Sequence, residues 1–454
     1  MATYKHGIYI SEEATALKPM ITVDAPTVVI GCAKKGPVSD PTLIHSMSEF
    51  EKTFGWSTDF KNYSLCEAAD VFFNLYNVAP VIFINCLDGT KHFKEKTVEV
   101  TGLANPVKLS GTILSELTIT SGSTTLLPAD FTLKDNMLTI TAQNKIVNDK
   151  ATVKYKILAP GNVKESDIVS GISKVERVYP KLQLVPGTLI APRWSFKSKV
   201  AKSLIGKAKS INGIFKSIAV CDISAASTTS YKDVNTGKTN INLVSEFAVA
   251  CWPQVIVGKR KYYLSSHVAA LMNQVDDKHD GIPYESPSNK ILQIDGAVLY
   301  DKTPVQLTQR EANYINGLGV VTTLQFEGLR LWGNNTSIYP TSSDPKDRFI
   351  PIRRMFNYVG NTLVTSFFSQ IDDPMNRRLI DSVLDRVNDY LHGLTARGAL
   401  LSGGKIYFLE EENPLTSLAA GKIKFHIYLA PPPPAEAIDF VLEYDVNLLS
   451  SLFD

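Results

Sequence analysis

The stretch that follows residue 420 alternates between apolar and polar residues up to a run of four prolines. In residues 422–429 every second side chain is apolar, and this period of two is typical of a half-buried strand. The apolar set is Ile423, Phe425, Ile427 and Leu429. Because proline fixes φ and has no N–H to give to a helix or a sheet, residues 431–434 are expected to form an extended spacer.

The same alternation begins again beyond the prolines. Apolar or aromatic side chains share one face of this second stretch: Ile438, Phe440, Leu442 and Tyr444. The spacer carries this predicted strand away from the first one, so a hairpin between the two is not expected. Its partner must lie elsewhere, on this chain or on another.

A short strand is also predicted at the N-terminal end, within residues 3–20. The sequence TYKHGIYISEE mixes polar and apolar residues, and the extended tail ATALKPM follows it. Like the predicted strand at the other end, it has no hairpin partner beside it.

Between these two ends the pattern is that of an α/β protein. A β-branched run at 27–33 comes first, then a short helix at 46–55 with Ser46 or Ser48 as N-cap and Gly55 past its end, a helix at 64–77 and a strand at 81–85. This strand, VIFIN, is apolar on both faces, as expected for a strand covered by helices on both sides. After residue 160 the pattern resumes, with helices at 166–178, 197–212 and 264–275 and strands at 187–194, 217–223 and 255–258.

Residues 91–160 interrupt this pattern. They contain short alternating runs broken by Gly, Asn-Pro, Asp-Asn and Ser clusters, and none of the runs has a helical period. We predict that they form a small antiparallel β domain inserted into the α/β domain.

Two amphipathic helices are predicted in the last part of the chain. The first has an apolar face formed by Ile352, Met355, Phe356, Val359 and Leu363. The second is expected to begin with Asp373 as N-cap and Pro374 in its first turn. Its apolar stripe consists of Leu379, Val383, Val387, Tyr390 and Leu394. Each helix has a charged face opposite the apolar one.

Composition narrows the classes of function. A chain of 454 residues is expected to contain about two to four domains. The 47 Lys and Arg residues nearly balance the 45 Asp and Glu residues, and a net charge of +2 argues against nucleic acid as the main partner. The five cysteines lie singly in apolar contexts, which indicates buried, reduced thiols. Without a signal peptide or an apolar run of about 18 residues, a soluble protein with no membrane insertion is expected.

A search for catalytic motifs favours no enzyme. The phosphate-binding pattern GxxxxGK[ST] is missing, as are HExxH and GxSxG. His267 and His279 lie near Asp276, Asp277 and Asp280, and the polar end of a helix explains them better than a metal site. The basic run 197–210 keeps apolar residues at helical spacing, which favours an amphipathic helix over a nucleic-acid patch. No cofactor is expected.

Three motifs occur in order along the chain: YKHGIYISEE at 4–13, GLGVVTTLQFEGLRLWGNNT at 317–336 and the proline-containing segment 419–445. Together they resemble the tail sheath proteins of contractile phage tails and of related contractile injection systems such as R-type bacteriocins. In the second motif the matching residues are Gly328, Arg330, Trp332, Gly333 and Thr336. In the third they are Gly421, Pro431, Pro434, Glu436, Ile438 and Phe440. The resemblance covers both ends and most of 161–454.

One position departs from the family pattern. Where the family commonly has Arg before the threonine of the second motif, this chain has Asn335, so an ion pair made by that arginine is in doubt. Arg330 remains and is expected to be able to pair with a carboxylate in the domain core.

The resemblance implies a function for the two unpartnered strands. Sheath subunits exchange terminal arms, so that the N-terminal strand of one copy and the C-terminal strand of another add to a small sheet of a third. The arm residues expected to contact other subunits are Tyr4, Gly7, Ile8, Tyr9, Ile10, Glu436, Ile438, Phe440, Leu442 and Tyr444. Residues 11–20 and 430–435 are expected to be tethers that bend while the strands stay paired.

The resemblance also implies a domain plan. It consists of an N-terminal arm (1–20), an α/β sheath domain (21–90 and 161–345), an inserted outer β domain (91–160), a C-terminal inner domain (346–435) and a C-terminal arm (436–454). The inner domain is expected to face the tail tube. A candidate tube contact is the charged helix face with Arg377, Arg378, Asp381, Asp385 and Arg386, although a merely solvated face explains these charges nearly as well.

The expected partners are further copies of this chain in a helical polymer of stacked hexameric rings, the inner tail tube protein, and baseplate and tail terminator proteins. The expected location is a virion tail or a bacteriocin particle assembled in the cytoplasm of a bacterial host. Two alternatives stay open: an α/β enzyme with a β accessory domain, and a tail or baseplate protein that assembles without contracting.

Overall fold

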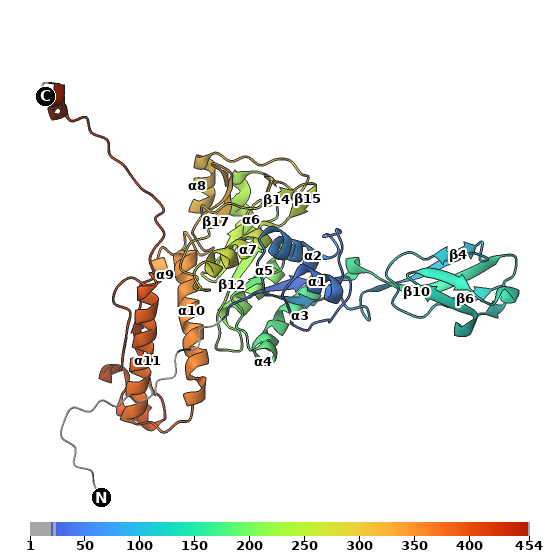
Figure 1. Ribbon diagram of the computed structural model, residues 1–454, viewed down its shortest axis with the longest axis horizontal. Helices are drawn as coiled ribbons and strands as arrows, with labels where there is room; N and C mark the ends of the chain where they lie inside the picture. The colour runs from blue at the N-terminus through green and yellow to red at the C-terminus, as the bar shows by residue number, and fades with distance from the viewer. Residues whose placement is uncertain (1–19, 21–23, 453–454) are drawn as a thin grey trace, which may run out of the picture.

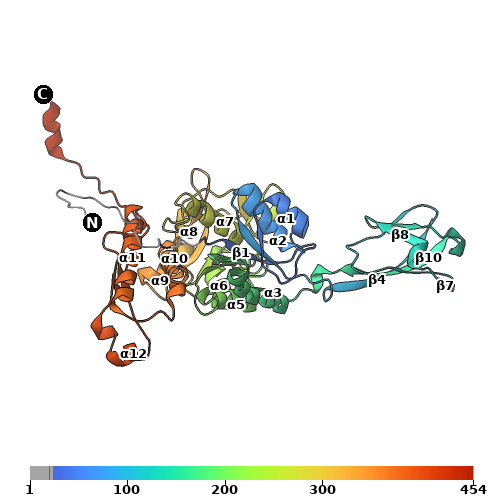
Figure 2. The same ribbon diagram turned by 60° about the horizontal axis from the view of Figure 1, so that its bottom comes forward.

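The computed structural model describes residue 20 and residues 24–452. Within these residues the chain has three parts along its long axis (Figure 1). A large sheet with helices on both faces lies in the middle, a group of small antiparallel sheets extends to one side, and a pair of long helices lies on the other. Figure 2 shows the small sheets standing clear of the central sheet. The N-terminal strand predicted within residues 3–20 falls almost wholly outside the described residues.

The central sheet has eight strands in the order β18-β17-β13-β12-β11-β1-β3-β2. Six inner strands run parallel: β1 (Thr27–Gly31), β3 (Val81–Asn85), β11 (Thr188–Ile190), β12 (Ile218–Asp222), β13 (Ala248–Cys251) and β17 (Val320–Gln325). The edge strands β2 (Thr42–Ile44) and β18 (Leu329–Trp332) are antiparallel to their neighbours. Nearly every residue of the inner strands is buried, as the continuous apolar runs require.

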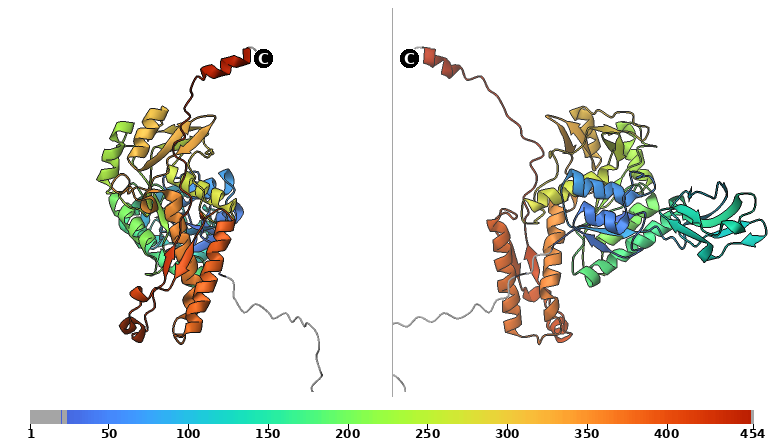
Figure 3. Two further views of the ribbon diagram at one scale, coloured as in Figure 1. Left: turned by 90° about the vertical axis from the view of Figure 1, so that its left-hand side faces the viewer. Right: turned by 45° about the vertical axis from the view of Figure 1, so that its right-hand side comes forward.

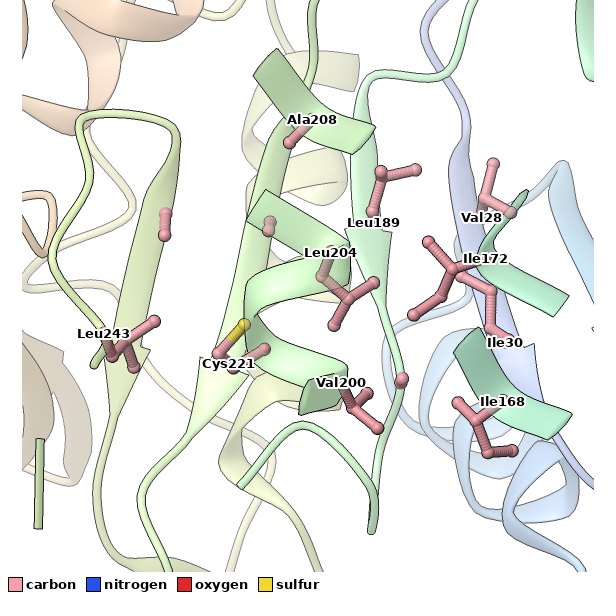
Figure 4. Close-up of a cluster of buried hydrophobic side chains, with 14 of the residues drawn as sticks. Val28, Ile30, Ile168, Ile172, Leu189, Val200, Leu204, Ala208, Cys221 and Leu243 are labelled. Carbon is pink, nitrogen blue, oxygen red and sulfur yellow. The ribbon is translucent and has the colours of Figure 1, made fainter. Parts of the chain in front are cut away.

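Alternate side chains of these strands point into two hydrophobic clusters. On one face Val28, Ile30 and Leu189 pack against α3 (Glu165–Ser173) and α5 (Ser198–Lys209), as Figure 4 shows. The basic run 197–210 is therefore an amphipathic helix, as predicted, with Val200, Ala201, Leu204 and Ala208 on its buried side.

The other face is covered by α1 (Met47–Phe54), by α2 (Ser64–Ala69), which continues as a π-helical segment to Leu75, and by α7 (Leu264–Asp277). Ser46 caps α1, as one of the two predicted alternatives, because its Oγ accepts the N–H of Glu49 at 3.2 Å. The predicted single helix at 64–77 is thus an α-helical turn followed by a wider one.

Further short elements surround the sheet. They are α4 (Val178–Leu182), α6 (Val234–Asn240), α8 (Gln309–Gly317) and a three-stranded antiparallel sheet of β14 (Gln254–Val257), β15 (Arg260–Tyr262) and β16 (Gly296–Val298). The predicted strand 255–258 belongs to this small sheet and not to the central one. Its place in the central sheet is taken by β13, which ends just before Trp252 and Pro253, where the chain turns away.

The region between β3 and α3 is antiparallel β structure, as predicted for the fold class. One sheet has the order β4-β10-β6-β7, with β4 (Phe93–Thr101), β10 (Lys150–Leu158), β6 (Thr118–Ser121) and β7 (Thr124–Thr125). The other consists of β5 (Val107–Lys108), β9 (Met137–Ile140) and β8 (Phe131–Lys134). The two sheets share one hydrophobic cluster around Ile119, Leu138 and Val153.

After the short α9 (Pro345–Arg348), the long helices α10 (Ile350–Phe367) and α11 (Arg377–Ala396) form an antiparallel pair. Met355, Val359, Val387 and Leu391 belong to a cluster of their own. Figure 3 shows the two-stranded sheet of β19 (Lys405–Tyr407) and β20 (His426–Tyr428) beside this pair, and α12 (Leu415–Ala419) lies between these strands in the chain.

The predicted start of α11 is wrong. Asp373 and Pro374 precede the helix, and Asn376 is the N-cap, with its Oδ1 accepting the N–H of Leu379 at 2.9 Å. Asp372 has φ +70°, so the chain is still turning there. Aspartate and asparagine cap helices about equally well, so residue type alone did not show that the cap lies three residues after Asp373.

Polar contacts join α10 to the central sheet. Arg354 makes a bidentate ion pair with Asp276 of α7, and both side chains are buried. Asn357 Nδ2 donates to Ser217 O at 3.0 Å, and the Asn361 amide both donates to and accepts from the backbone of Lys216. One side of α10 therefore packs on α11 through apolar side chains, and the other docks on the sheet through hydrogen bonds.

No helix within the described residues is long and apolar enough to cross a membrane.

A buried histidine leads to a prediction about pH. His267 of α7 is fully buried, its Nδ1 lies 3.2 Å from Tyr76 Oη, and burial lowers its pKa to about 3. The unfolded chain binds a proton at this residue below about pH 6.5, so its contribution to stability is present at pH 7 and is lost as the pH falls. Relative to His267→Asn, the wild type should lose about 2 kcal/mol of unfolding free energy between pH 7 and pH 5.

Urea denaturation of both proteins at pH 7, 6 and 5 measures this difference. Titration of all other groups cancels in the comparison to first order. A difference that stays constant over this range would show that His267 is not held neutral.

Candidate assembly site

The second sequence motif forms an edge hairpin of the central sheet. β17 and β18 pair with Leu324 opposite Arg330, and Gly328 makes the turn with φ +111°. Gly333 follows β18 with φ +130°, and a Cβ at this position would lie 2.6 Å from the end of the Asn316 side chain. The backbone itself therefore requires glycine after this strand.

Trp332 and Arg330 fasten the hairpin to its surroundings. Trp332 Nε1 donates to Asn313 Oδ1 of α8 at 2.9 Å. Arg330 donates from Nε to Phe326 O and from Nη1 to Asn289 O, both at 2.8 Å. The expected carboxylate partner of Arg330 is thus wrong, since the guanidinium is bonded to main-chain carbonyls at the surface end of the hairpin.

Thr336 joins the motif to the start of the helical part. Its N–H donates to Arg348 O at 2.7 Å, and its buried hydroxyl donates to Asp347 O at 2.6 Å. Ile350 N in turn donates to Asn334 O at 2.8 Å. Residues 334–336 therefore lie along residues 347–350, where α9 passes into α10.

Arg348 occupies the place where these segments meet, and sequence analysis did not single it out. Its Nε donates to Asn335 Oδ1 at 2.7 Å, and its Nη2 makes an ion pair with Glu436. Its guanidinium carbon lies 4.6 Å from the ring centroids of both Tyr339 and Phe349. The aromatic residues near Arg348 in the sequence were the only local sign of this contact. Its hydrogen-bonding partners, Asn335 and Glu436, lie 13 and 88 residues away along the chain.

The departure at residue 335 has a structural consequence. Asn335 has no charge, but its amide oxygen orients a guanidinium that comes from another segment. Glu436, predicted among the arm residues that contact a neighbour, is bound here by its own chain.

The four prolines lie against the body of the protein and not free of it. Pro431 is buried, and Pro432–Pro434 form one wall of a pocket of about 640 Å³ whose other walls include Tyr284, Trp332 and Pro351. The freely bending tether expected at 430–435 is therefore held along the surface of its own subunit in this structure.

The chain leaves the body directly after Glu436. Ile438 is 69% exposed, Phe440 85% and Leu442 95%. The tail extends away from the helical pair and ends in a 3₁₀ turn at Val446–Leu452, as Figure 3 shows. Within the described part of the chain this segment pairs with no strand.

The candidate arm residues at the other end, Tyr4, Gly7, Ile8, Tyr9 and Ile10, lie outside the described residues.

The charged face of α11 divides into exposed and buried members. Arg377 pairs with Asp381 one turn later, with Nε and Oδ1 2.9 Å apart, and Arg378 and Asp385 are exposed. Arg386 is only 9% exposed, and its guanidinium lies 4.7 Å from the Phe367 ring of α10. Arg386 therefore belongs to the packing of the helical pair and not to the exposed charged face.

The carboxyl edge of the parallel sheet, where α/β proteins commonly bind ligands, is occupied by the chain's own side chains. Asp222, at the end of β12, accepts Ser265 N at 2.9 Å and the hydroxyls of Ser195 and Ser265. Glu67 accepts Tyr263 N at 2.5 Å and pairs with Arg193 at 2.7 Å. The N-terminus of α7, a natural anion site, is thus neutralised internally.

Burial raises the pKa of Glu67 to about 7 and that of Asp222 to about 6. Such shifts are found in catalytic sites, but also in structural networks of buried carboxylates. Both side chains are fully enclosed, so neither carboxylate reaches a cleft open to a substrate.

The histidine and aspartate cluster near residue 270 does not converge. His267 faces Tyr76 and Tyr262, whereas His279 contacts Glu285 and Tyr284, and Asp276 is engaged by Arg354. No group of three potential metal ligands is found among the described residues. All five cysteines are buried and unpaired, as predicted.

Comparison with known proteins gives a consistent result. The chain is 27% identical to the tail sheath protein of Burkholderia phage BcepMu over an alignment of 487 positions that covers 99% of both chains. It is 28% identical to the tail sheath protein of Escherichia phage P2 over 36% of this chain and 40% of that protein. No protein-family model matches the chain.

Solved structures show the same fold. The sheath complex of an extracellular contractile injection system, PVC, in its contracted state superposes with a TM-score of 0.61 at 15% identity, covering 99% of each chain. The contracted helical sheath of the anti-feeding prophage gives a TM-score of 0.61 at 14% identity, covering 98% of this chain and 100% of the other. The mixed α/β fold, inserted sheets included, is thus that of known sheath proteins.

Proposed function

We propose, from the premise that this chain is a homologue of tail sheath proteins, that it polymerises helically around an inner tail tube as the sheath of a contractile particle. One observation carries the proposal. Residues 438–444 present large apolar side chains to solvent on an extended segment that no strand of the described chain pairs with. Exposed apolar side chains of this kind favour association with another surface, because association removes them from water.

Strand addition supplies the mechanism. The small sheet of β19 and β20 has two strands, and both of its outer edges lack a partner strand within the described residues. Tyr407 and Tyr428 lie diagonally across its two strands, with their ring centroids 5.8 Å apart, and both are exposed. The C-terminal arm of one copy, with Ile438, Phe440, Leu442 and Tyr444 on one face, docks on this sheet of another copy through backbone hydrogen bonds.

The N-terminal arm completes the link in the same way. In the proposed polymer, Tyr4, Gly7, Ile8, Tyr9 and Ile10 add to the small sheet of a third subunit. Each subunit then gives its two arms to two neighbours and accepts the arms of other copies on its own small sheet, and this backbone pairing survives rotation of the subunit bodies.

The proposal divides the chain into five parts. The arms are 1–20 and 436–454, the sheath domain is 21–90 with 161–345, the outer β domain is 91–160 and the inner domain is 346–435. Separate hydrophobic clusters around Ile119 and around Val387 support a division into bodies that move as units. The β domain extends from the side opposite the helical pair, which supports placing one outermost and the other next to the tube (Figure 2).

Contraction in this proposal is rotation of rigid subunits into a packing of lower free energy, so no nucleotide is consumed. Side chains of the chain itself occupy the carboxyl edge of the sheet, and this supports a structural role over the alternative of an α/β enzyme. The second alternative, a tail or baseplate protein that does not contract, has the support that the anti-feeding prophage baseplate structure also matches, with a TM-score of 0.59.

The proposed partners are other copies in stacked hexameric rings, the inner tail tube protein, and baseplate and terminator proteins. The proposed location is a virion tail or bacteriocin-like particle assembled in the bacterial cytoplasm.

Deletion of residues 436–454 should abolish polymerisation while leaving the fold intact, because these residues contribute almost nothing to the cores. Thermal unfolding tests the fold, and electron microscopy with sedimentation tests the polymer. Tubes formed by the shortened chain would contradict arm exchange.

A pair of single substitutions tests the strand face. Phe440→Asp should raise the critical concentration for polymerisation at least about tenfold, since it places a charge on the apolar face of the docking segment at a cost of about 1.4 kcal/mol or more. Val441→Asp is the matched control, because Val441 is 92% exposed and lies on the opposite face. Equal effects of the two substitutions would argue against a paired strand.

Reversal of charge at Arg377 and Arg378 should prevent assembly on purified tubes without lowering the unfolding temperature, since both residues are exposed. Lys199→Glu with Lys202→Glu on α5 makes the same change in net charge on exposed positions of the sheath domain and should assemble normally. Cosedimentation with tubes measures both. Normal binding by the α11 variant would remove this face as the tube contact.

A further inference from the structure

The boundary between the bound and the free part of the C-terminal segment is sharp. Up to Glu436 the chain follows the wall of the pocket beside α8 and α9, and from Ile438 onward its side chains are mostly exposed. The last contact on the body is the ion pair between Glu436 and Arg348, whose side chains are 32% and 23% exposed. This contact therefore determines where the arm departs.

Arg348 is built to hold one orientation. Tyr339 and Phe349 contact its guanidinium, and Asn335 accepts its Nε–H at 2.7 Å, which leaves the other end of the fork for Glu436. Asn335 is itself buried and donates from Nδ2 to Asn316 O at 3.2 Å. A guanidinium held by a planar fork and aromatic rings loses little further freedom when it binds a carboxylate.

The ion pair sets the reach of the arm. With the pair closed, only Ala437 separates Glu436 from Ile438, and extended chain covers about 7 Å over these two residue steps. With the pair open and the prolines lifted from the pocket, the free segment runs from the buried Pro431, and the reach becomes about 24 Å over seven residues. A shorter tether confines the strand to a smaller volume and raises its effective concentration at a neighbouring sheet.

We propose that Arg348, oriented by Asn335, clamps Glu436 and thereby pre-organises the C-terminal arm for docking on a second copy of this chain. The inference rests on the proposed function, because it assigns the clamp to the arm exchanged between subunits. Arg348 and Asn335 are positioning residues: they contact the root of the arm and not the strand that docks.

The clamp is tested first in the unpolymerised protein. A nitroxide spin label is attached to Ala435→Cys, at the pocket wall, and its mobility is measured by electron paramagnetic resonance; the native cysteines are all buried. Glu436→Gln, which keeps the shape and removes the charge, should increase the mobile fraction at residue 435. Glu443→Gln is the matched control, because this exposed carboxylate lies in the same arm beyond the clamp.

The second measurement is the critical concentration for polymerisation of the same variants without the label. Glu436→Gln should raise it about fivefold, whereas Glu443→Gln should leave it unchanged.

Two results would overturn the inference. Unchanged mobility in Glu436→Gln would show that the pair does not hold the arm, and increased mobility with an unchanged critical concentration would show that holding it does not assist docking. A wild-type chain that forms no polymer would instead overturn the proposed function. It would also remove the role of the clamp in docking.

Discussion

The position of the helical pair on the central sheet depends on the buried ion pair between Arg354 of α10 and Asp276 of α7. Burial raises the pKa of Asp276 to about 6, although the charge of Arg354 acts in the opposite direction. Enclosing this carboxylate therefore costs free energy. Buried ion pairs add little to net stability, but removal of one partner leaves an unpaired charge and costs about 3–5 kcal/mol. This pair and the amides of Asn357 and Asn361 therefore specify one orientation of α10, and the arm root and the small sheet follow from it.

The edge of the α/β sheet where a ligand could bind is occupied in this chain by its own side chains. At the carboxyl edge of the sheet, Asp222 and Glu67 satisfy the N-terminus of α7, a position where other doubly wound proteins bind a ligand. Among the described residues, the exposed features lie at the periphery: the extended segment 438–444, which pairs with no strand, the two-stranded sheet of β19 and β20, and the charged face of α11. These features suit association with other proteins through backbone pairing and charge more than they suit chemistry on a small molecule.

Much of the fold could be predicted from local pattern, and the failures were specific. VIFIN and SIAVCDI are strands in the central sheet because runs buried on both faces carry a strong signal. The strand AVAC at 248–251 was missed, since four small residues give no distinctive period, and 255–258 took its place in the prediction. Of the candidate site, alternation alone singled out Ile438, Phe440, Leu442 and Tyr444, which are exposed in the structure, whereas Arg348, the buried state of Arg386 and the partners of Arg330 were not predicted.

Side-chain period in the sequence was enough to predict most of the strands and helices of the described chain and the absence of a neighbouring partner for residues 438–444, and the geometry of proline was enough to predict an extended spacer. That the proline segment lies against the body and that Glu436 meets Arg348 depends on tertiary packing. Those contacts join residues 88 positions apart. The sequence does not show which residue a charged or amide side chain will contact, because tertiary packing determines that partner.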